Sequence, residues 1–556
     1  MKATSLTFLL LSCALLSFSI SAQEKTKYIN ANGYTLNDSG ELLRFRQFVV
    51  LDDKIVSIDE RSEHSKNIDI VDLKGKTVLP GLIDAHGHIL GLGANLLEVD
   101  LRNTKSEQEA VQRVLAFVSK YKASNNTAPK WVIGRGWNQV LWPSKSFPSK
   151  ASLDKFFPDV PVYLSRIDGH AAWVNSKALT LANITKSTIS PSGGEIIIDA
   201  TGEPTGVLID NAEYLVTSLI PKPDKATIEA QFLAAMNHLI SLGITSAHDA
   251  GINKTIRDFY IDKAESEQIP MRIYAMLAAT DPQLLQMLKD GHYEDSNNTL
   301  SIRSVKAYGD GALGSRGAAL LKPYSDDPDN SGLLVTAEEK LPSLFNTIIG
   351  ANFQLNFHAI GDRANRLALQ QFARTFENFP ENKSRHRIEH AQVIAVEDIP
   401  LFEEFGIIPS MQPTHATSDM NMAEDRIGKA RLKGAYAWQT FLNQGTPIAF
   451  GSDFPVELAN PFHGLHAAIT RQNDQKQPKD GWIANERVSR QAALKGFTLD
   501  AAYAAFQENM LGSLEVGKKA DFIVIDKDYF EIEASEIRDI QVLATYVNGN
   551  LVYAID

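Results

Sequence analysis

Apolar and polar positions alternate with two different periods through the middle of the chain. Segments in which apolar residues recur every three or four positions predict helices at 107–122, 227–242, 337–350, 363–377, 396–405, 432–443 and 489–495. Short apolar runs ending in polar residues predict strands at 244–249, 271–276, 305–310, 354–359, 387–390, 407–411 and 447–453. Strand and helix in repeated alternation predict parallel strands, and their number suits an α/β fold with a TIM-like (β/α)8 barrel.

Both ends of the chain have a different pattern, of short apolar runs separated by turns. The Asn548-Gly549-Asn550 step between two such runs predicts a hairpin. We therefore expect a small composite β-sandwich built from residues 23–79 and 506–556, flanking a barrel at 80–505. Residues from about 120 to 225 break the strand–helix alternation with Trp, Pro and Gly-rich turns, and we interpret them as an inserted lid region over the barrel mouth.

The length and charge of the chain narrow its class. A chain of 556 residues, with 44% hydrophobic and 22% charged positions, is long enough for a large barrel and an accessory domain. The formal net charge is −12 and there is no basic tract, which argues against binding to nucleic acid or to an anionic membrane surface. A small-molecule substrate is the expected partner, and the sequence leaves open whether the protein forms a homo-oligomer.

The first residues have the pattern of a secretory signal peptide. Lys2 precedes an apolar run from 9 to 20, and small residues around Ala22 are followed by polar sequence. We therefore expect residues 1–22 to be removed and the protein to be exported, either to the periplasm or as a secreted protein. Cys13, the only cysteine, lies in a segment that resembles a lipoprotein box, so lipid anchoring is the alternative.

Two histidines end an apolar run that follows a Pro-Gly step. Side chains alternate between the two faces of a strand, so His86 and His88 point the same way, with Asp84 behind them. Two neutral imidazoles at the end of a buried strand can bind one transition metal together. A His-x-His pair by itself is a weak signal, so its meaning depends on other residues further along the chain.

Four later strands end in a candidate metal ligand, namely Lys306, His358, His390 and Asp453. Taken singly, each histidine is more often a hydrogen-bonded core residue, the lysine an ion-pair partner and the aspartate a helix cap. A lysine inside an apolar strand is costly to bury as a free cation, so it is either paired or chemically altered. Because the carboxyl ends of barrel strands meet at one face, the four residues together predict a metal site.

These motifs resemble those of the metal-dependent amidohydrolase superfamily and, within it, amidohydrolase family 3, the YtcJ-like proteins. The resemblance covers nearly all of the chain after the predicted signal peptide, including both sandwich segments. It is carried by Leu-Pro-Gly-Leu-Ile-Asp-Ala-His-Gly-His at 79–88, Asp-Gly-Ala-Leu-Gly-Ser-Arg at 310–316, His-Ala-Ile-Gly-Asp at 358–362, Glu-His-Ala at 389–391 and Gly-Ser-Asp at 451–453.

The resemblance implies a metal centre with two ions, and zinc is the expected metal. His86 and His88 would bind the first ion together with Asp453. His358 and His390 would bind the second. Other divalent metals such as iron or manganese, and a site with a single ion, are the alternatives that the sequence leaves open.

Lys306 has a special place in this implied centre. It would be carboxylated by CO2, and the resulting carbamate would bridge both ions. Two dications favour an anion at this position. The modification would also remove the cost of burying a free ammonium group.

The implied reaction is the hydrolysis of a carbon–nitrogen bond, other than a peptide bond, in an amide, N-acyl or cyclic amide substrate. A metal-activated hydroxide would attack the carbonyl carbon. Asp453 would accept the proton of the attacking water and pass it to the leaving amine. Hydrolysis of an ester, lactone or phosphotriester on the same site, and a catalytically dead binding scaffold, are the alternatives.

Four residues are candidate substrate contacts. Arg316 either grips a carboxylate or carbonyl group of the substrate or ties down its own loop. Trp137 either lines a pocket or packs within the insertion. His170 belongs to the insertion and His415 follows a strand, and each would contact substrate if it reached the barrel mouth.

Three further polar residues are expected to support the site. His248 ends an earlier strand, where support of the metal ligands from behind is favoured over metal binding. Asp310 and Asp362 follow two of the ligand-bearing strands, and they either orient metal ligands or cap helices.

Overall fold

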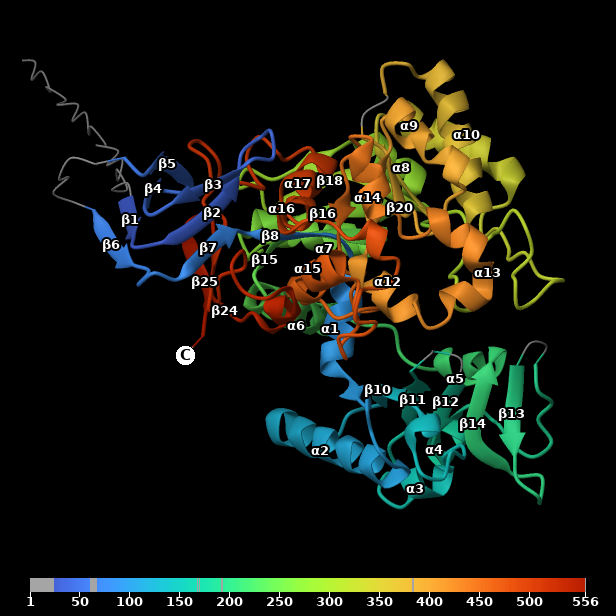
Figure 1. Ribbon diagram of the computed structural model, residues 1–556. Helices are drawn as coiled ribbons and strands as arrows, with labels where there is room; N and C mark the ends of the chain where they lie inside the picture. The colour runs from blue at the N-terminus through green and yellow to red at the C-terminus, as the bar shows by residue number, and fades with distance from the viewer. Residues whose placement is uncertain are drawn as a thin grey trace, which may run out of the picture.

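The computed structural model describes residues 25–60, 68–167, 169, 171–191, 194–382 and 385–555 (Figure 1). The predicted signal peptide, with Cys13, lies outside the described residues. None of the helices in the described ranges combines the length and the apolar character needed to cross a membrane.

Eight parallel strands form the barrel, and each barrel strand pairs with the barrel strand that follows it in the sequence. Their order is β8 (Leu82–Gly87), β15 (Ile244–Ile252), β16 (Arg272–Ala278), β18 (Leu300–Tyr308), β19 (Gln354–Ala359), β20 (Arg387–His390), β21 (Ile408–Met411) and β22 (Ala449–Phe450). A parallel bridge between Gly87 and Phe454 brings the last strand back to the first. The predicted (β/α)8 barrel is thereby confirmed.

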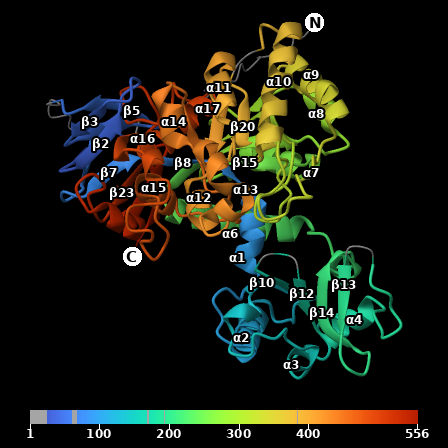
Figure 2. The same ribbon diagram turned by 45° about the vertical axis from the view of Figure 1, so that its right-hand side comes forward.

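Helices surround the strands, as Figures 1 and 2 show. They are α6 (Lys225–Ser241), α7 (Lys254–Glu265), α8 (Leu284–Asp290), α9 (Leu341–Gly350), α10 (Asp362–Asn378), α11 (Pro400–Phe405), α12 (Pro413–Asp419), α13 (Ala423–Arg431), α14 (Trp438–Asn443), α15 (Pro461–Thr470), α16 (Arg490–Gly496) and α17 (Leu499–Ala504). In α10 the residues Ala364, Ala368, Phe372 and Phe376 recur at intervals of four and are buried. This spacing places them on one face, which packs against the barrel.

The junction between the first and last strands is held by Asp84. Its carboxylate accepts hydrogen bonds from the hydroxyl of Ser452 at 2.6 Å and from the backbone amides of Ser452 and His86 at 3.1 Å. Burial raises the pKa of Asp84 to about 7. Gly451 lies so close that an added Cβ would come within 2.6 Å of the His86 nitrogen. Only glycine therefore allows the two strands to approach this closely.

The two ends of the chain form the composite β-sandwich. One sheet has the order β5 (Lys54–Ile58), β4 (Phe48–Leu51), β1 (Lys25–Ile29) and β6 (Asp69–Asp72). The other has the order β25 (Asn550–Ala554), β24 (Val542–Val547), β23 (Phe522–Ile525), β7 (Thr77–Pro80), β2 (Asn32–Leu36) and β3 (Leu42–Phe45). Strand β7 from the N-terminal part thus pairs with β23 from the C-terminal part. The core of the sandwich includes the stacked rings of Phe522 and Tyr546, whose centroids lie 4.2 Å apart. The predicted hairpin is β24–β25.

A buried ion pair connects the barrel to this sandwich. Arg272 on β16 binds both carboxylate oxygens of Asp521, with Nε and Nη2 at 2.7 and 3.0 Å. Both side chains are buried. Replacing Arg272 by glutamine leaves the Asp521 charge buried without its cation, and we expect the free energy of unfolding, measured by urea titration, to fall by about 3 to 5 kcal/mol.

Asp521→Asn provides the check on that prediction. The double variant should lose much less free energy of unfolding than the two single variants lose together, because both substitutions remove the same interaction. Additive losses would contradict the coupling.

The insertion has its own mixed sheet, which begins earlier than expected. Its order is β13 (Gly194–Ile198), β14 (Pro204–Asp210), β12 (Ala171–Val174), β11 (Val162–Arg166), β10 (Val132–Trp137) and β9 (Val99–Asp100). The helices are α2 (Glu107–Asn125), α3 (Lys150–Asp154), α4 (Ser176–Leu181) and α5 (Tyr214–Thr217). Since β9 pairs with β10, the insertion starts at about Val99 and not near residue 120. Both views show it projecting from the barrel at α1 (Ile89–Leu97) and not lying across it, where we expected a lid (Figures 1 and 2).

Candidate metal centre

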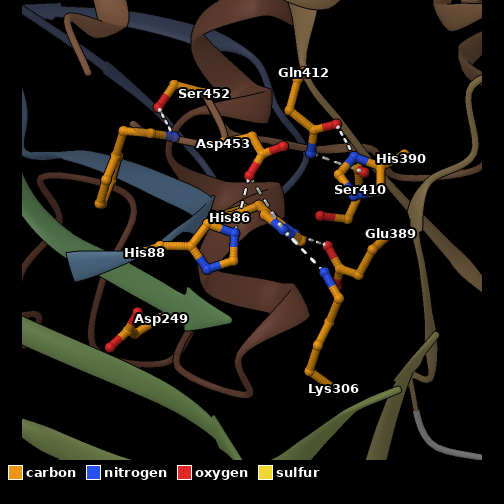
Figure 3. Close-up of polar contacts among 12 residues, drawn as sticks. His86, His88, Asp249, Lys306, Glu389, His390, Ser410, Gln412, Ser452 and Asp453 are labelled. Carbon is orange, nitrogen blue, oxygen red and sulfur yellow. Dashed lines mark hydrogen bonds and ion pairs between the residues drawn. The ribbon is translucent and has the colours of Figure 1, made fainter. Parts of the chain in front are cut away.

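The six predicted ligands come together at one end of the barrel. His86 and His88 lie at the end of β8 and Asp453 follows β22. Their side chains point toward one another, with Lys306 and His390 alongside (Figure 3). His358, at the end of β19, stacks edge-on against His390 with a centroid distance of 4.5 Å. Residues up to 367 positions apart in the sequence, from His86 to Asp453, thus share one small volume.

His86, His88 and Asp453 form a group that could hold one ion. The Oδ1 atom of Asp453 lies 3.2 Å from Nε2 of His88 and 3.7 Å from Nε2 of His86. One ligand atom from each of the three residues lies within 4.8 Å of the other two. This is the spacing expected of donors that converge on a single tetrahedral ion.

Lys306 reaches the same point from β18. Its Nζ atom lies 3.1 Å from Nε2 of His86. The side chain is buried, and this burial lowers the pKa of Lys306 to about 8. About a tenth of this amine is therefore neutral at pH 7, far more than for an exposed lysine.

His358 and His390 form the second side of the centre. The Nδ1 atom of His390 lies 2.8 Å from Oε1 of Gln412, which leaves its Nε2 for another partner. Nε2 of His358 is buried without a hydrogen bond, 3.6 Å from Oδ1 of Asp310. Asp310 also accepts backbone hydrogen bonds from the loop after β19, at Ile360. Asp310 therefore fixes the loop that follows this predicted ligand.

His415, predicted as a substrate contact, lies beside Asp453 itself. Its Nε2 is 3.6 Å from Oδ2 of Asp453, and its ring lies nearly parallel to that of His390 with centroids 5.9 Å apart. His390, His415 and Asp453 form a second group whose ligand atoms lie within 4.8 Å of one another. Asp453 thus presents one oxygen to each side of the centre.

The electrostatics of the site suit a metal ion. Burial lowers the pKa of His86 to about 4 and that of His358 to about 3, and it holds the pKa of His390 well below its usual value. These imidazoles are neutral near pH 7 and offer lone pairs. Burial alone would raise the pKa of Asp453, but the surrounding histidines outweigh it and hold this pKa well below its usual range. Neutral nitrogen donors beside an ionised carboxylate are a donor set that zinc favours.

Two of the predicted ligands have an unusual backbone conformation. His390 has φ 75° and Asp453 has φ 62°, both in the left-handed region that side-chain-bearing residues rarely adopt. Such conformations persist where the surrounding structure imposes them, and they cluster at functional sites. The sequence carried no signal for either.

Sequence reasoning missed Glu389, Arg387 and Gln412 as individual functional residues. Glu389 accepts a hydrogen bond from Nδ1 of His86, and Arg387 forms an ion pair with Glu389 at 2.8 Å. Alternation along β20 was the available signal, since it puts Arg387 and Glu389 on one face. His248 lies 2.9 Å from Nη1 of Arg387, which places it behind the ligands as expected.

The remaining candidate contacts lie elsewhere. Arg316 forms an ion pair with Asp326 at 3.0 Å, which is the loop-tying alternative. Trp137 is fully buried in the core of the insertion, and its indole nitrogen donates to the carbonyl of Leu164 at 2.7 Å, which is the packing alternative. His170 lies outside the described residues. Asp362 begins α10 and accepts a hydrogen bond from the amide of Leu321.

Known proteins resemble this chain in sequence and in fold. A sequence profile of the amidohydrolase family matches residues 69–553. The protein YtcJ of Bacillus subtilis (strain 168) is 32% identical over 496 residues, which cover 87% of this chain and 90% of that protein. The N-substituted formamide deformylase of Arthrobacter pascens is 25% identical over 505 residues, covering 89% and 91%. The crystal structure of an uncharacterized metal-dependent hydrolase from Pyrococcus furiosus has a TM-score of 0.74 at 29% identity and covers 91% of this chain and 100% of that one. The chain therefore belongs to the amidohydrolase family.

Proposed function

We propose that the protein is an exported hydrolase that cleaves the carbon–nitrogen bond of an amide, N-acyl or cyclic amide substrate. The observation that carries this proposal is the position of Asp453, whose two oxygens face His88 and His415 at 3.2 and 3.6 Å. The deformylase relative from Arthrobacter pascens, which acts on N-substituted formamides by its name, supports a C–N bond as the target. The signal-peptide pattern of residues 1–22 supports export.

In this proposal the nitrogen and oxygen donors at the strand ends would hold two zinc ions. His86, His88 and Asp453 would hold the first ion, and His358 and His390 the second. Lys306, whose buried Nζ lies 3.1 Å from Nε2 of His86, would react with CO2 and supply a carbamate anion as a further metal ligand. When bound, such ions polarise the substrate carbonyl and lower the pKa of water in the site.

The protein's own part in the reaction is the transfer of a proton. Oδ1 of Asp453 is turned toward His86 and His88, so Oδ2, on the side of His415, is the oxygen available to the substrate. There it accepts the proton of the attacking water and delivers it to the nitrogen of the leaving amine. Without that proton the amine would leave as a high-energy anion, so this step matters most for amides.

A substrate panel tests the proposal. We expect the zinc-loaded protein to release amine from N-formyl and N-acyl amides, measured by a colorimetric amine assay, with matched esters assayed in parallel. If esters are hydrolysed and amides are not, the protein is an ester or lactone hydrolase and the proposal is wrong. No turnover of either class by metal-loaded protein would replace it by a binding scaffold.

A further inference from the structure

Behind His86, on the inner face of the barrel, lie two fully buried charged residues of β20. Arg387 and Glu389 are two positions apart, so their side chains share one face of the strand. Both have no exposed surface. Glu389 reaches His86 on the side away from Asp453, as Figure 3 shows. A buried cation and a buried anion thus stand directly against a predicted metal ligand.

The contact with Glu389 determines which nitrogen of His86 faces the metal position. A carboxylate only accepts hydrogen bonds, so the proton of this pair resides on Nδ1 of His86, which donates to Oε2 of Glu389. Nε2 therefore carries the lone pair. That atom lies 3.1 Å from Nζ of Lys306 and 3.7 Å from Oδ1 of Asp453, inside the centre. A hydrogen bond to the second nitrogen also fixes the orientation of the ring.

Arg387 in turn holds Glu389. Its Nε lies 2.8 Å from Oε1 of Glu389, and its Nη2 donates to Oε2 at 3.2 Å. Arg387 also donates to the carbonyl of Ala85 on β8 and to the hydroxyl of Ser410 on β21 at 2.8 Å, and it contacts His248 on β15. A guanidinium group stays charged in any protein environment, so this ion pair persists at any pH at which Glu389 is ionised. Arg387 therefore fixes Glu389 relative to three other strands.

Stability alone does not account for this pair. Desolvating a buried arginine and carboxylate costs about as much as their attraction returns, and apolar residues often replace such pairs without loss. We propose that Arg387 and Glu389 are positioning residues: Glu389 presents Nε2 of His86 to the first metal ion, and Arg387 keeps Glu389 in place. This inference rests on the metal centre of the proposed function and extends it by one layer of residues.

Cobalt binding tests the inference without reference to activity. Metal-free full-length protein is titrated with Co2+ in competition with a chelator, and the visible absorption of the bound Co2+ is recorded. Relative to wild type, we expect Glu389→Ala to weaken the first Co2+ site by about 10- to 100-fold and to alter its spectrum. Glu389→Gln, which keeps an acceptor oxygen of the same shape, should recover part of the loss. Arg387→Gln should weaken the site in the same direction as Glu389→Ala.

Arg272→Gln is the matched control. It removes a second fully buried barrel arginine with a carboxylate partner, but that partner, Asp521, belongs to the sandwich. It should reduce stability and leave Co2+ affinity and spectrum at wild-type values. All variants are compared without urea, at a temperature at which circular dichroism shows that each of them is folded.

The outcomes distinguish the positioning role of Arg387 and Glu389 from the metal centre itself. Wild-type affinity and spectrum in Glu389→Gln and Arg387→Gln would overturn the positioning role while leaving the metal centre intact. Equal weakening by Arg387→Gln and Arg272→Gln would also overturn it, since a general loss of packing would then suffice. Failure of the wild-type protein to bind Co2+ would overturn the metal centre and the positioning role together.

Discussion

Replacing Asp453 by asparagine should lower kcat/KM for an amide substrate by about 10³-fold or more. Asparagine has nearly the same shape but cannot accept the proton of the attacking water, and general acid–base groups typically contribute 10²- to 10⁴-fold. The variant also removes the carboxylate charge that faces both His88 and His415. An activated ester should lose at least about tenfold less, because its leaving group departs without a proton. Initial rates on a matched amide and ester measure both effects.

Asp295→Asn is the matched control for this substitution. Asp295 is also a mostly buried aspartate, but it accepts hydrogen bonds from Thr299 and Leu300 at the start of β18, at the opposite end of the barrel strands. Its rates should stay within about twofold of wild type, as for most changes away from a site. Amide turnover retained by metal-loaded Asp453→Asn would remove Asp453 from the proton-transfer role.

Removing the metal should abolish hydrolysis and destabilise the protein. Dialysis against a strong chelator strips the proposed ligands His86, His88, His358 and His390 of their ions. A ligand present at about 100 times its dissociation constant contributes about 2.7 kcal/mol to the free energy of unfolding, so the metal-free protein should melt at a lower temperature. Added zinc should restore both properties, measured by amine release and thermal unfolding. Full activity after complete removal of metal, verified by elemental analysis, would contradict the proposed centre.

Lys306→Ala tests whether Lys306 carries CO2 and contributes to metal binding. Elemental analysis and intact mass of the wild type should give about two ions per chain and the added mass of CO2, and the variant should lose the CO2 and at least one ion. Lys263→Ala is the control, because Lys263 is also a buried lysine but pairs with Glu229 at 2.6 Å on the outer helices. One ion and no CO2 in the wild type would assign Lys306 the role of a free amine in a single-metal site.

The sequence by itself determined the scaffold and the principal donors. The alternation of helical and strand periods located the barrel strands, and the composite sandwich followed from the turn-rich ends. His86, His88, His358, His390 and Asp453 could be named because each ends an apolar strand, and parallel strands of one barrel end at one face. That inference needs only local patterns and one rule of topology.

The tertiary structure decided what surrounds those donors. The contacts from Arg387 to Glu389 and on to His86, and the approach of His415 to Asp453, join strands whose spacing is set by barrel closure. The start of the insertion at Val99 depends on a strand pairing of two residues, too short to leave a pattern.

The environment of Trp137 was also left open by the sequence. A tryptophan in a glycine-rich segment is equally compatible with a pocket wall and with a core, and only the packing of the insertion placed it inside. Periodicity reports which face of an element is apolar. Which residue of another element meets that face is decided by contacts between distant parts of the chain, and these exist only once the chain has folded.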